Sequence, residues 1–394
     1  MTTAKLKWFT RGFDSALSAG RSIIPPTINF VLAYLVIKKS GQPTWGQFVD
    51  VLIFMSLSGI LVSFGIKEYV LRQASLEPNK LGALVQNGIL VRIALLIPCS
   101  ITAYCLFPTN QALWLIAWLI SGLIYAGINP IVNFTRGYGK AIVSELVFGS
   151  FILIFLSVQT IDQNKLISSF AIAHILRSII LGFFFRQNLR PVKVNLHMNL
   201  LVAGFPFFVM ALSGMLQSKT DLYLASAILD NSDLAVYQVS INFFLYLQAL
   251  GGLILLPFSK NLYRVSKALI FKISIRFALF GIIFLCTTLP IIYGLLNNLY
   301  GFDIGWKIIG IGGLYVLPTF VFSPLIYKLL GKNMERVVLY VILFGVLVNG
   351  TFTYFLLLKL GFIGAFIGSM ISNWAMLFVY LVVFGTKLKS NEKT

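Results

Sequence analysis

The stretch GMLQSKTDLYLASAIL, residues 214–229, places Lys219 and Asp221 inside an otherwise apolar run. The run begins near residue 200 and is therefore long enough to cross a membrane as a helix. An ionised group at the centre of a bilayer costs about 2.5 to 3.5 kcal/mol on insertion scales. Two charges kept at that cost indicate a site within the membrane.

The whole chain has the composition of an integral membrane protein. It has 394 residues, of which 58% are hydrophobic and 11% charged, against about 25% charged in soluble domains. Runs of spanning length lie at residues 17–37, 48–66, 82–106, 112–133, 141–160, 167–185, 200–228, 235–257, 273–296, 307–327, 337–358 and 363–386. We therefore predict an all-α protein with twelve transmembrane helices.

The two halves of the chain look related. RGF at Arg11 and AGF at Ala203 precede the first helix of each half, and Arg72 and Arg264 each follow a second helix, at an offset of about 192 residues. Six helices return the chain to the side on which it began, so the repeat is parallel. This predicts two six-helix bundles, residues 1–196 and 197–394.

The distribution of Lys and Arg predicts the orientation. Alternate loops hold 21 of these residues on one side and 5 on the other, so the positive-inside rule places both termini in the cytoplasm. This also explains the net charge of +19 without nucleic acid. The segment FSKNLYRVSKALIFK from Phe258 predicts a basic helix face on the inner leaflet, unless it reflects the orientation bias alone.

Motifs of enzymes are not found in the sequence. It has no phosphate-binding GxxxxGK[ST] loop, no nucleophile elbow, no HExxH and no paired carboxylates. The predicted external loops are too short for a catalytic domain. We therefore expect a transporter rather than an enzyme, with no cofactor and no metal.

Cations outnumber anions inside the predicted spans, which favours an anionic substrate. We predict that Arg21, Arg92, Arg177 and Lys219 bind it and that Asn29 contributes a hydrogen bond to a hydroxyl-rich ligand. Arg92 lies at mid-helix, about 15 Å from either end at 1.5 Å per residue, and its side chain cannot easily snorkel to water from there. A buried structural partner is the alternative role for it. Arg276 is four residues from Lys272, and snorkelling to the cytoplasm explains it.

Prolines are expected to interrupt two helices at corresponding positions, Pro25 and Pro26 in the first and Pro206 in the seventh. Such interruptions point to a substrate pathway. Asp221 is the candidate coupling residue, because a desolvated carboxylate retains a proton. It points about 160° away from Lys219 around the helix at 100° per residue, so the two do not form a facing salt bridge. The alternative is that Asp221 neutralises Arg21, Arg92 or Arg177.

These residues resemble a known family. Gly204-Phe205-Pro206, Lys219-Thr220-Asp221, the run LAVYQVSINFFLYLQAL from Leu234 and WGQF at Trp45 are similar to the polysaccharide (O-antigen and capsule) flippases of the multidrug, oligosaccharidyl-lipid and polysaccharide exporter superfamily. That family more often has Arg where Lys219 stands. The resemblance implies two bundles around a central cavity that rock in alternating access.

The same resemblance implies the substrate and the location. It implies translocation of an undecaprenyl-diphosphate-linked oligosaccharide across the bacterial cytoplasmic (inner) membrane. Membrane lipids, and the polysaccharide polymerase and glycosyltransferases of the same route, are the implied partners. A peptidoglycan-precursor flippase or a drug/cation antiporter of the superfamily is the alternative, and a membrane glycan polymerase is a further one.

Overall fold

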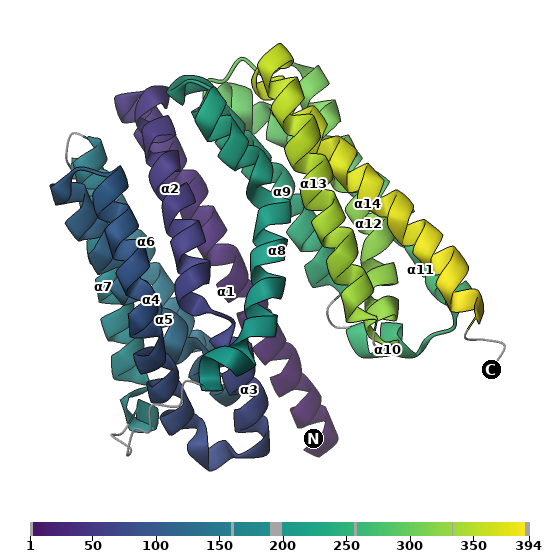
Figure 1. The fold of residues 1–394 in the computed structure, drawn as a ribbon, viewed down its shortest axis with the longest axis horizontal. Coiled ribbons are helices and arrows are strands. Elements are labelled where there is room, and N and C mark those ends of the chain that lie inside the picture. The colour runs from purple at the N-terminus through teal and green to yellow at the C-terminus, as the bar shows by residue number, and fades with distance from the viewer. Residues whose placement is uncertain (1–2, 159–160, 190–198, 256–257, 333, 391–394) are drawn as a thin grey trace. The chain divides into compact units, whose positions relative to one another are not determined.

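The computed structural model describes residues 3–158, 161–189, 199–255, 258–332 and 334–390, and these are almost entirely helical (Figure 1). The first half of the chain forms α1 (Thr3–Ser40), α2 (Gln42–Ser63), α3 (Ile66–Leu76), η1 (Pro78–Lys80), α4 (Leu81–Leu106), α5 (Thr109–Thr135), α6 (Tyr138–Val158), α7 (Gln163–Phe184) and η2 (Arg186–Leu189). The second half forms α8 (Asn199–Ile228), α9 (Asn231–Leu255), α10 (Ser259–Arg264), α11 (Lys267–Gly294), η4 (Leu295–Leu299), α12 (Trp306–Leu330), α13 (Glu335–Leu360) and α14 (Phe362–Ser390).

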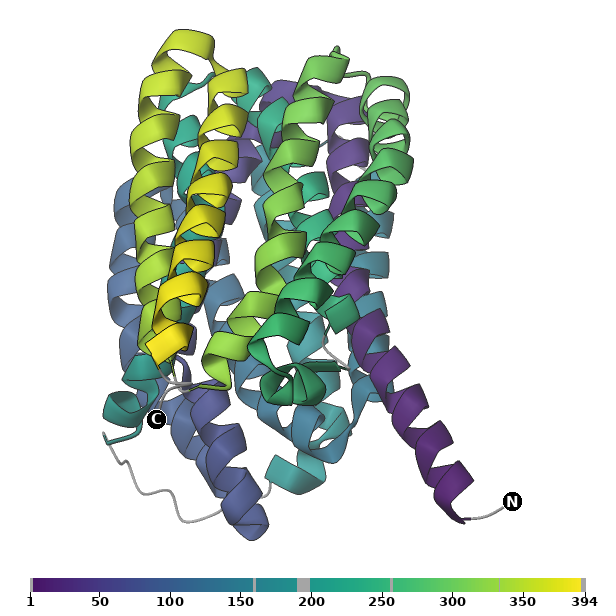
Figure 2. The same ribbon diagram turned by 90° about the vertical axis from the view of Figure 1, so that its right-hand side faces the viewer.

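The described residues include 12 helical segments long and apolar enough to cross a membrane. Each coincides with one of the predicted runs, so the predicted fold class is confirmed. Helices α13 and α14 pack along each other over most of their length (Figure 2). The chain is a multi-pass, all-α membrane protein.

Two compact units divide the chain, Met1–Leu212 and Ser213–Thr394. The boundary lies inside α8, so the first half of this helix packs with the first six spans and its second half with the others. The boundary predicted at residues 196 and 197 lies within 190–198, outside the described residues, and remains a prediction.

Aromatic side chains form the centre of each unit. In the first unit Phe170 packs against Phe48, with ring centroids 4.9 Å apart, and against Trp118, at 5.2 Å. In the second unit the Phe366 ring lies 4.8 Å from that of Tyr237. All five rings are at least nine-tenths buried, so close packing rather than hydrophobicity alone positions the helices.

The predicted proline interruptions are wrong. Pro25 and Pro26 lie inside the continuous helix α1, and Pro206 lies inside the continuous helix α8. Proline removes one backbone donor, but in a membrane span neighbouring groups and small local adjustments let the helix continue. These residues therefore do not mark breaks in the helices.

The chain breaks instead between α2 and α3. Phe64 and Gly65 are both left-handed, with φ of 45° and 65°, and this conformation ends α2 at Ser63. Position 65 requires glycine for a second reason: a Cβ there would lie 2.5 Å from the backbone nitrogen of Phe208 in α8. The phenyl rings of Phe64 and Phe208 stack with centroids 4.6 Å apart.

The predicted basic face of the segment from Phe258 is also wrong. The segment bends at Val265, between α10 and α11, so Arg264 and Lys267 belong to different helices. Ser266 caps α11 by accepting a hydrogen bond from the Leu269 amide at 3.4 Å. The Lys267 amine donates to the Gly385 carbonyl at 3.2 Å.

Candidate functional site

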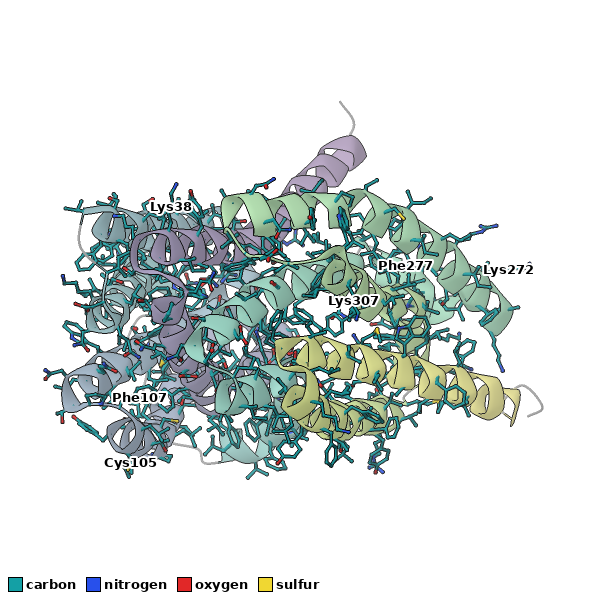
Figure 3. The ribbon with its side chains drawn as sticks, turned by 90° about the horizontal axis from the view of Figure 1, so that it is seen from above. Lys38, Cys105, Phe107, Lys272, Phe277 and Lys307 are labelled. Carbon is teal, nitrogen blue, oxygen red and sulfur yellow. The ribbon has the colours of Figure 1, made fainter. Side chains whose placement is uncertain are left out.

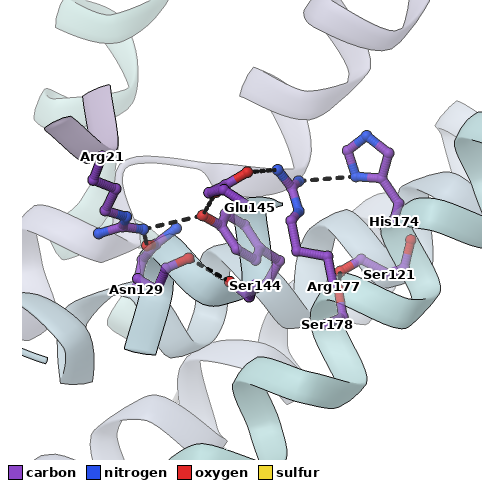
Figure 4. Close-up of polar contacts among 10 residues, drawn as sticks. Arg21, Ser121, Asn129, Ser144, Glu145, His174, Arg177 and Ser178 are labelled. Atoms are coloured by element: carbon purple, nitrogen blue, oxygen red, sulfur yellow. Dashed lines mark hydrogen bonds and ion pairs between the residues drawn. The ribbon is translucent and has the colours of Figure 1, made fainter. Parts of the chain in front are cut away.

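A charged cluster inside the first unit joins α1, α5, α6 and α7 (Figure 4). Arg177 donates from Nη1 to Oε2 of Glu145 at 2.9 Å, and the Tyr125 hydroxyl donates to the other oxygen of the same carboxylate. Arg21 donates from Nη2 to the Tyr125 hydroxyl at 3.1 Å and to Oδ1 of Asn129. Two residues predicted to bind substrate, Arg21 and Arg177, are thus brought together.

The cluster carries more positive than negative charge. Glu145 is 2% exposed and Arg177 is 9% exposed, so water screens this ion pair poorly. The guanidinium of Arg177 also lies 3.8 Å from the ring centroid of Tyr125, a cation–π contact. One carboxylate between two guanidinium groups leaves a net charge of +1, and Arg21, at the end of the chain of contacts, is only half-buried.

A cavity adjoins this cluster within the same unit. Its volume is about 260 Å³, and its walls come from α2, α5 and α7: Met55, Ser56, Gly59, Ile60, Val62, Ser63, Trp118, Leu119, Gly122, Leu123 and His174. His174 connects the cavity to the cluster, because its Nδ1 lies 2.9 Å from Nη2 of Arg177. The two residues are three apart on α7 and therefore lie on the same face of this helix.

Sequence reasoning missed Glu145 and Tyr125, the residues that join the two arginines. Glu145 is a single carboxylate in the apolar run 141–160. The argument that singled out Asp221, a charge inside a span, applies equally to Glu145 and could have found it. Nothing in the sequence distinguishes Tyr125 from other aromatic residues in the spans.

Arg92 has different partners. Its side chain is 2% exposed, and Nε donates to the Gly88 carbonyl at 2.7 Å while Nη1 donates to the Ser63 carbonyl at 3.4 Å. Ser63 is the last residue of α2, so the guanidinium lies at the negative end of that helix dipole. Across the described residues Arg92 has no carboxylate partner within 4.0 Å. These contacts favour the structural alternative for Arg92.

In the second unit, Asp221 is buried at 2% exposure and accepts a hydrogen bond from the Tyr237 hydroxyl of α9. Lys219 is half-buried, and its amine lies 3.5 Å from Oδ1 of Asn242, also on α9. Among the ion pairs of the described residues, none includes Asp221 or Lys219. Lys219 and Asp221 therefore contact different residues of the same helix, α9.

Neutral polar groups from α8, the helix that carries Asp221, form a hydrogen-bond network with groups from α13 and α14. Asn349 donates to the Gln217 carbonyl at 3.5 Å and accepts from Thr353 at 2.7 Å. Gln217 donates to Oδ1 of Asn373 at 3.2 Å. The hydrogen bonds of these two sites do not include Asn29, which lies on α1 and is exposed.

Metal ligands do not gather in the part of the chain that is described: no three His, Cys, Asp or Glu side chains lie close enough to hold an ion. The chemistry offered by both units is charge and hydrogen bonding. Such groups can hold an anion, a proton or a polar headgroup.

The described residues form two compact helical units with twelve candidate membrane spans, and each unit contains a buried polar site. No protein-family model and no curated protein sequence matches this chain. Solved structures share the fold. The chain is similar to the lipid II flippase MurJ in an inward closed conformation, with a TM-score of 0.67 and 15% identity over 93% of this chain and 87% of that one.

Transporters of the multidrug resistance MATE family, from the MOP superfamily, are also similar. An inward-facing structure matches with a TM-score of 0.62 and 13% identity over 96% of this chain and 99% of that one. An outward-facing structure matches with a TM-score of 0.60 and 14% identity over 96% and 95%. At these identities the likeness establishes the fold.

Proposed function

We propose that the protein is a flippase that moves an undecaprenyl-diphosphate-linked oligosaccharide, such as an O-antigen repeat unit, from the cytoplasmic to the outer face of the inner membrane by alternating access around a central cavity. The observation that carries the proposal is the excess positive charge of the Arg21–Tyr125–Glu145–Arg177 cluster, with Arg21 half-buried at its end. A diphosphate is the complementary ligand, since guanidinium groups bind phosphate oxygens in paired hydrogen bonds.

Each residue of the site has a proposed role. Arg21 contacts the diphosphate, and Arg177 fixes Glu145 and so sets the position of Tyr125, which in turn orients Arg21. The exposed Asn29 donates to sugar hydroxyls, and Lys219 adds positive charge from the second unit. We assign Arg92 to the packing of α2 against α4.

Transport in proteoliposomes tests the binding role. Vesicles containing the protein receive a polyprenyl-diphosphate oligosaccharide, and its appearance in the other leaflet is measured with an impermeant glycan-modifying reagent. Arg21→Lys should retain part of the rate and Arg21→Gln should lose about tenfold or more, the worth of one charge-assisted contact. Arg72→Gln, an exposed arginine on α3, is the matched control and should transport normally.

A second candidate is a flippase for a peptidoglycan precursor, and the likeness to MurJ favours it, because that protein is named a lipid II flippase. Both candidates share the lipid diphosphate and differ in the glycan. The same vesicles should therefore be offered lipid II, and also a cationic drug of the kind that a multidrug exporter would move. Faster transport of lipid II would select the second candidate, and transport of the cation alone would contradict both.

Coupling is proposed to reside at Asp221. Its burial and its hydrogen bond from a neutral tyrosine, with no cation in ion-pair distance among the described residues, support a carboxylate that exchanges an ion. Asp221→Asn should insert normally, abolish net export and remove its dependence on a proton gradient; a sodium gradient is tested in parallel. Recovery of export on combining Asp221→Asn with neutralisation of Arg21, Arg92 or Arg177 would instead identify a structural ion pair.

A further inference from the structure

Two cations on α11 lie on a face that is otherwise apolar and exposed. Lys272 and Arg276 are one helical turn apart, and the same stripe continues with Leu279, 56% exposed, and Ile283, 67% exposed. Exposed leucine and isoleucine in a membrane span face lipid chains rather than water. Figure 3 shows Lys272 projecting away from the ribbon near the end of its helix.

No protein group among the described residues neutralises these two cations. Within the described residues, neither Lys272 nor Arg276 makes a side-chain hydrogen bond or an ion pair. The sequence has no Asp or Glu between Asp233 and Asp303, so α11 itself supplies none. Both cations lie in the first half of α11, whose amino end carries the positive pole of the helix dipole. Positive charge therefore accumulates there without compensation.

The helix start that carries this charge is held in place. The amine of Lys328, a side chain that is 7% exposed, donates to the Tyr263 carbonyl at 3.3 Å and to the Val265 carbonyl at 2.6 Å. These bonds fix the bend between α10 and α11, and the Ser266 cap fixes the first turn of α11. The backbone that carries the two cations is therefore fixed in position before a ligand binds, which lowers the entropic cost of ligand binding.

We propose that Lys272 and Arg276 bind the phosphate of an anionic phospholipid in the cytoplasmic leaflet. Residues four apart on a helix are neighbours on one face, with Cβ atoms about 6 Å apart, so the Lys272 amine and the Arg276 guanidinium can both contact one phosphate. The acyl chains of that lipid lie along Leu279 and Ile283. This site is independent of the transported substrate, because it lies on the lipid-facing surface of α11 and not in the charged cluster of the first unit.

Thermal unfolding of the purified full chain in detergent tests the proposal, with phosphatidylglycerol or phosphatidylcholine added in increasing amounts. Phosphatidylglycerol should raise the unfolding temperature in a saturable way, and phosphatidylcholine should not. The variant Lys272→Gln/Arg276→Gln should need about tenfold more phosphatidylglycerol for the same shift, since each basic residue near the surface contributes to binding of anionic lipid. Arg276→Lys should lose less than the double variant.

Lys332→Gln/Arg336→Gln is the matched control, because these two exposed cations carry the same charge and lie on the predicted cytoplasmic side, Lys332 between α12 and α13 and Arg336 in the first turn of α13. This control variant should respond to phosphatidylglycerol as the wild type does. Equal loss in both double variants would overturn the proposal, because the response would then follow net charge. An equal stabilisation by inorganic phosphate would also overturn it, because the site would then not require the lipid.

Discussion

At the scale of single residues, Glu145 holds the first unit's site together. Its two carboxylate oxygens accept from Arg177 and from Tyr125, and Tyr125 accepts from Arg21. Removing one member of a buried ion pair leaves the other charge uncompensated, whereas an exposed pair contributes little. The contribution of the Glu145 carboxylate to the free energy of unfolding therefore depends on its burial rather than on the number of its hydrogen bonds.

Glu145→Gln should therefore lower the free energy of unfolding by about 3 to 5 kcal/mol. Glu77→Gln is the control: Glu77 pairs with Lys80 at 2.5 Å, but both side chains are more than half exposed, and its loss should cost under about 1 kcal/mol. Denaturant unfolding in detergent micelles measures both. Combining Glu145→Gln with Arg177→Met should restore part of the loss; a double variant no more stable than Glu145→Gln would contradict the ion-pair account.

Arg92 provides a second test at this scale. Because its guanidinium bridges the carbonyls of Gly88 and Ser63, Arg92→Gln should lower the unfolding free energy by about 2 kcal/mol, and Arg92→Lys should lower it less. The amount of folded protein in the membrane and its unfolding temperature are measured together with transport. If Arg92→Gln has normal stability but no transport, the structural role is wrong and Arg92 is a substrate-binding residue.

At the scale of elements, the break between α2 and α3 lets two backbones touch. A Cβ at Gly65 would lie 2.5 Å from the Phe208 nitrogen, and a Cβ at Gly204 would lie 2.8 Å from the Phe64 carbonyl oxygen. The two glycines therefore let the break pack directly on the first half of α8. Gly204 belongs to the GFP motif at residues 204–206, so this contact gives the motif a packing role.

Gly65→Ala and Gly204→Ala should each destabilise the chain by about 1 to 3 kcal/mol, through overpacking and, at position 65, the left-handed backbone. Gly59→Ala and Gly214→Ala are matched controls within the neighbouring helices, because a Cβ at either position meets no atom within 4 Å. Thermal unfolding compares the four variants. Similar stability of all four would show that the contact between the break and α8 is loose.

At the scale of the whole molecule, orientation rests on the asymmetry of 21 against 5 basic residues. Lys39, one of the five on the minority side, has a local role: its amine donates to the Leu156 and Ser157 carbonyls at 2.8 and 2.6 Å. These are among the last carbonyls of α6, where a cation is favoured by the helix dipole. Lys39 therefore does not weaken the prediction.

Reporter fusions test the orientation directly. A fusion after Lys80 should be active with a cytoplasmic reporter, and a fusion after Asn231 with an external one, because an odd number of the predicted spans separates the two positions. A fusion after Lys332 should match the first. The reverse pattern at all three positions would invert the orientation, and with it the leaflet assigned to the lipid site on α11.

The number of spans could be predicted from the sequence alone, because a bilayer requires about 20 apolar residues per helix and hydropathy is a local property. The sequence also singled out Arg21, Arg177 and Asp221, since a charge in an apolar run is visible without knowledge of its neighbours in space. It misjudged Pro25, Pro26 and Pro206, because whether proline breaks a helix depends on groups around it.

Which charged residues contact one another depends on the packing of the helices and could not be predicted from the sequence. Arg177 reaches Glu145 across 32 residues, and Arg21 reaches Tyr125 across 104. Arg92 and Arg21 look alike in sequence, yet the first contacts two carbonyls at a helix end and the second a tyrosine and an asparagine. Partners so distant along the chain depend on how the helices pack, and packing is set by side-chain shape rather than by the hydropathy that defines the spans.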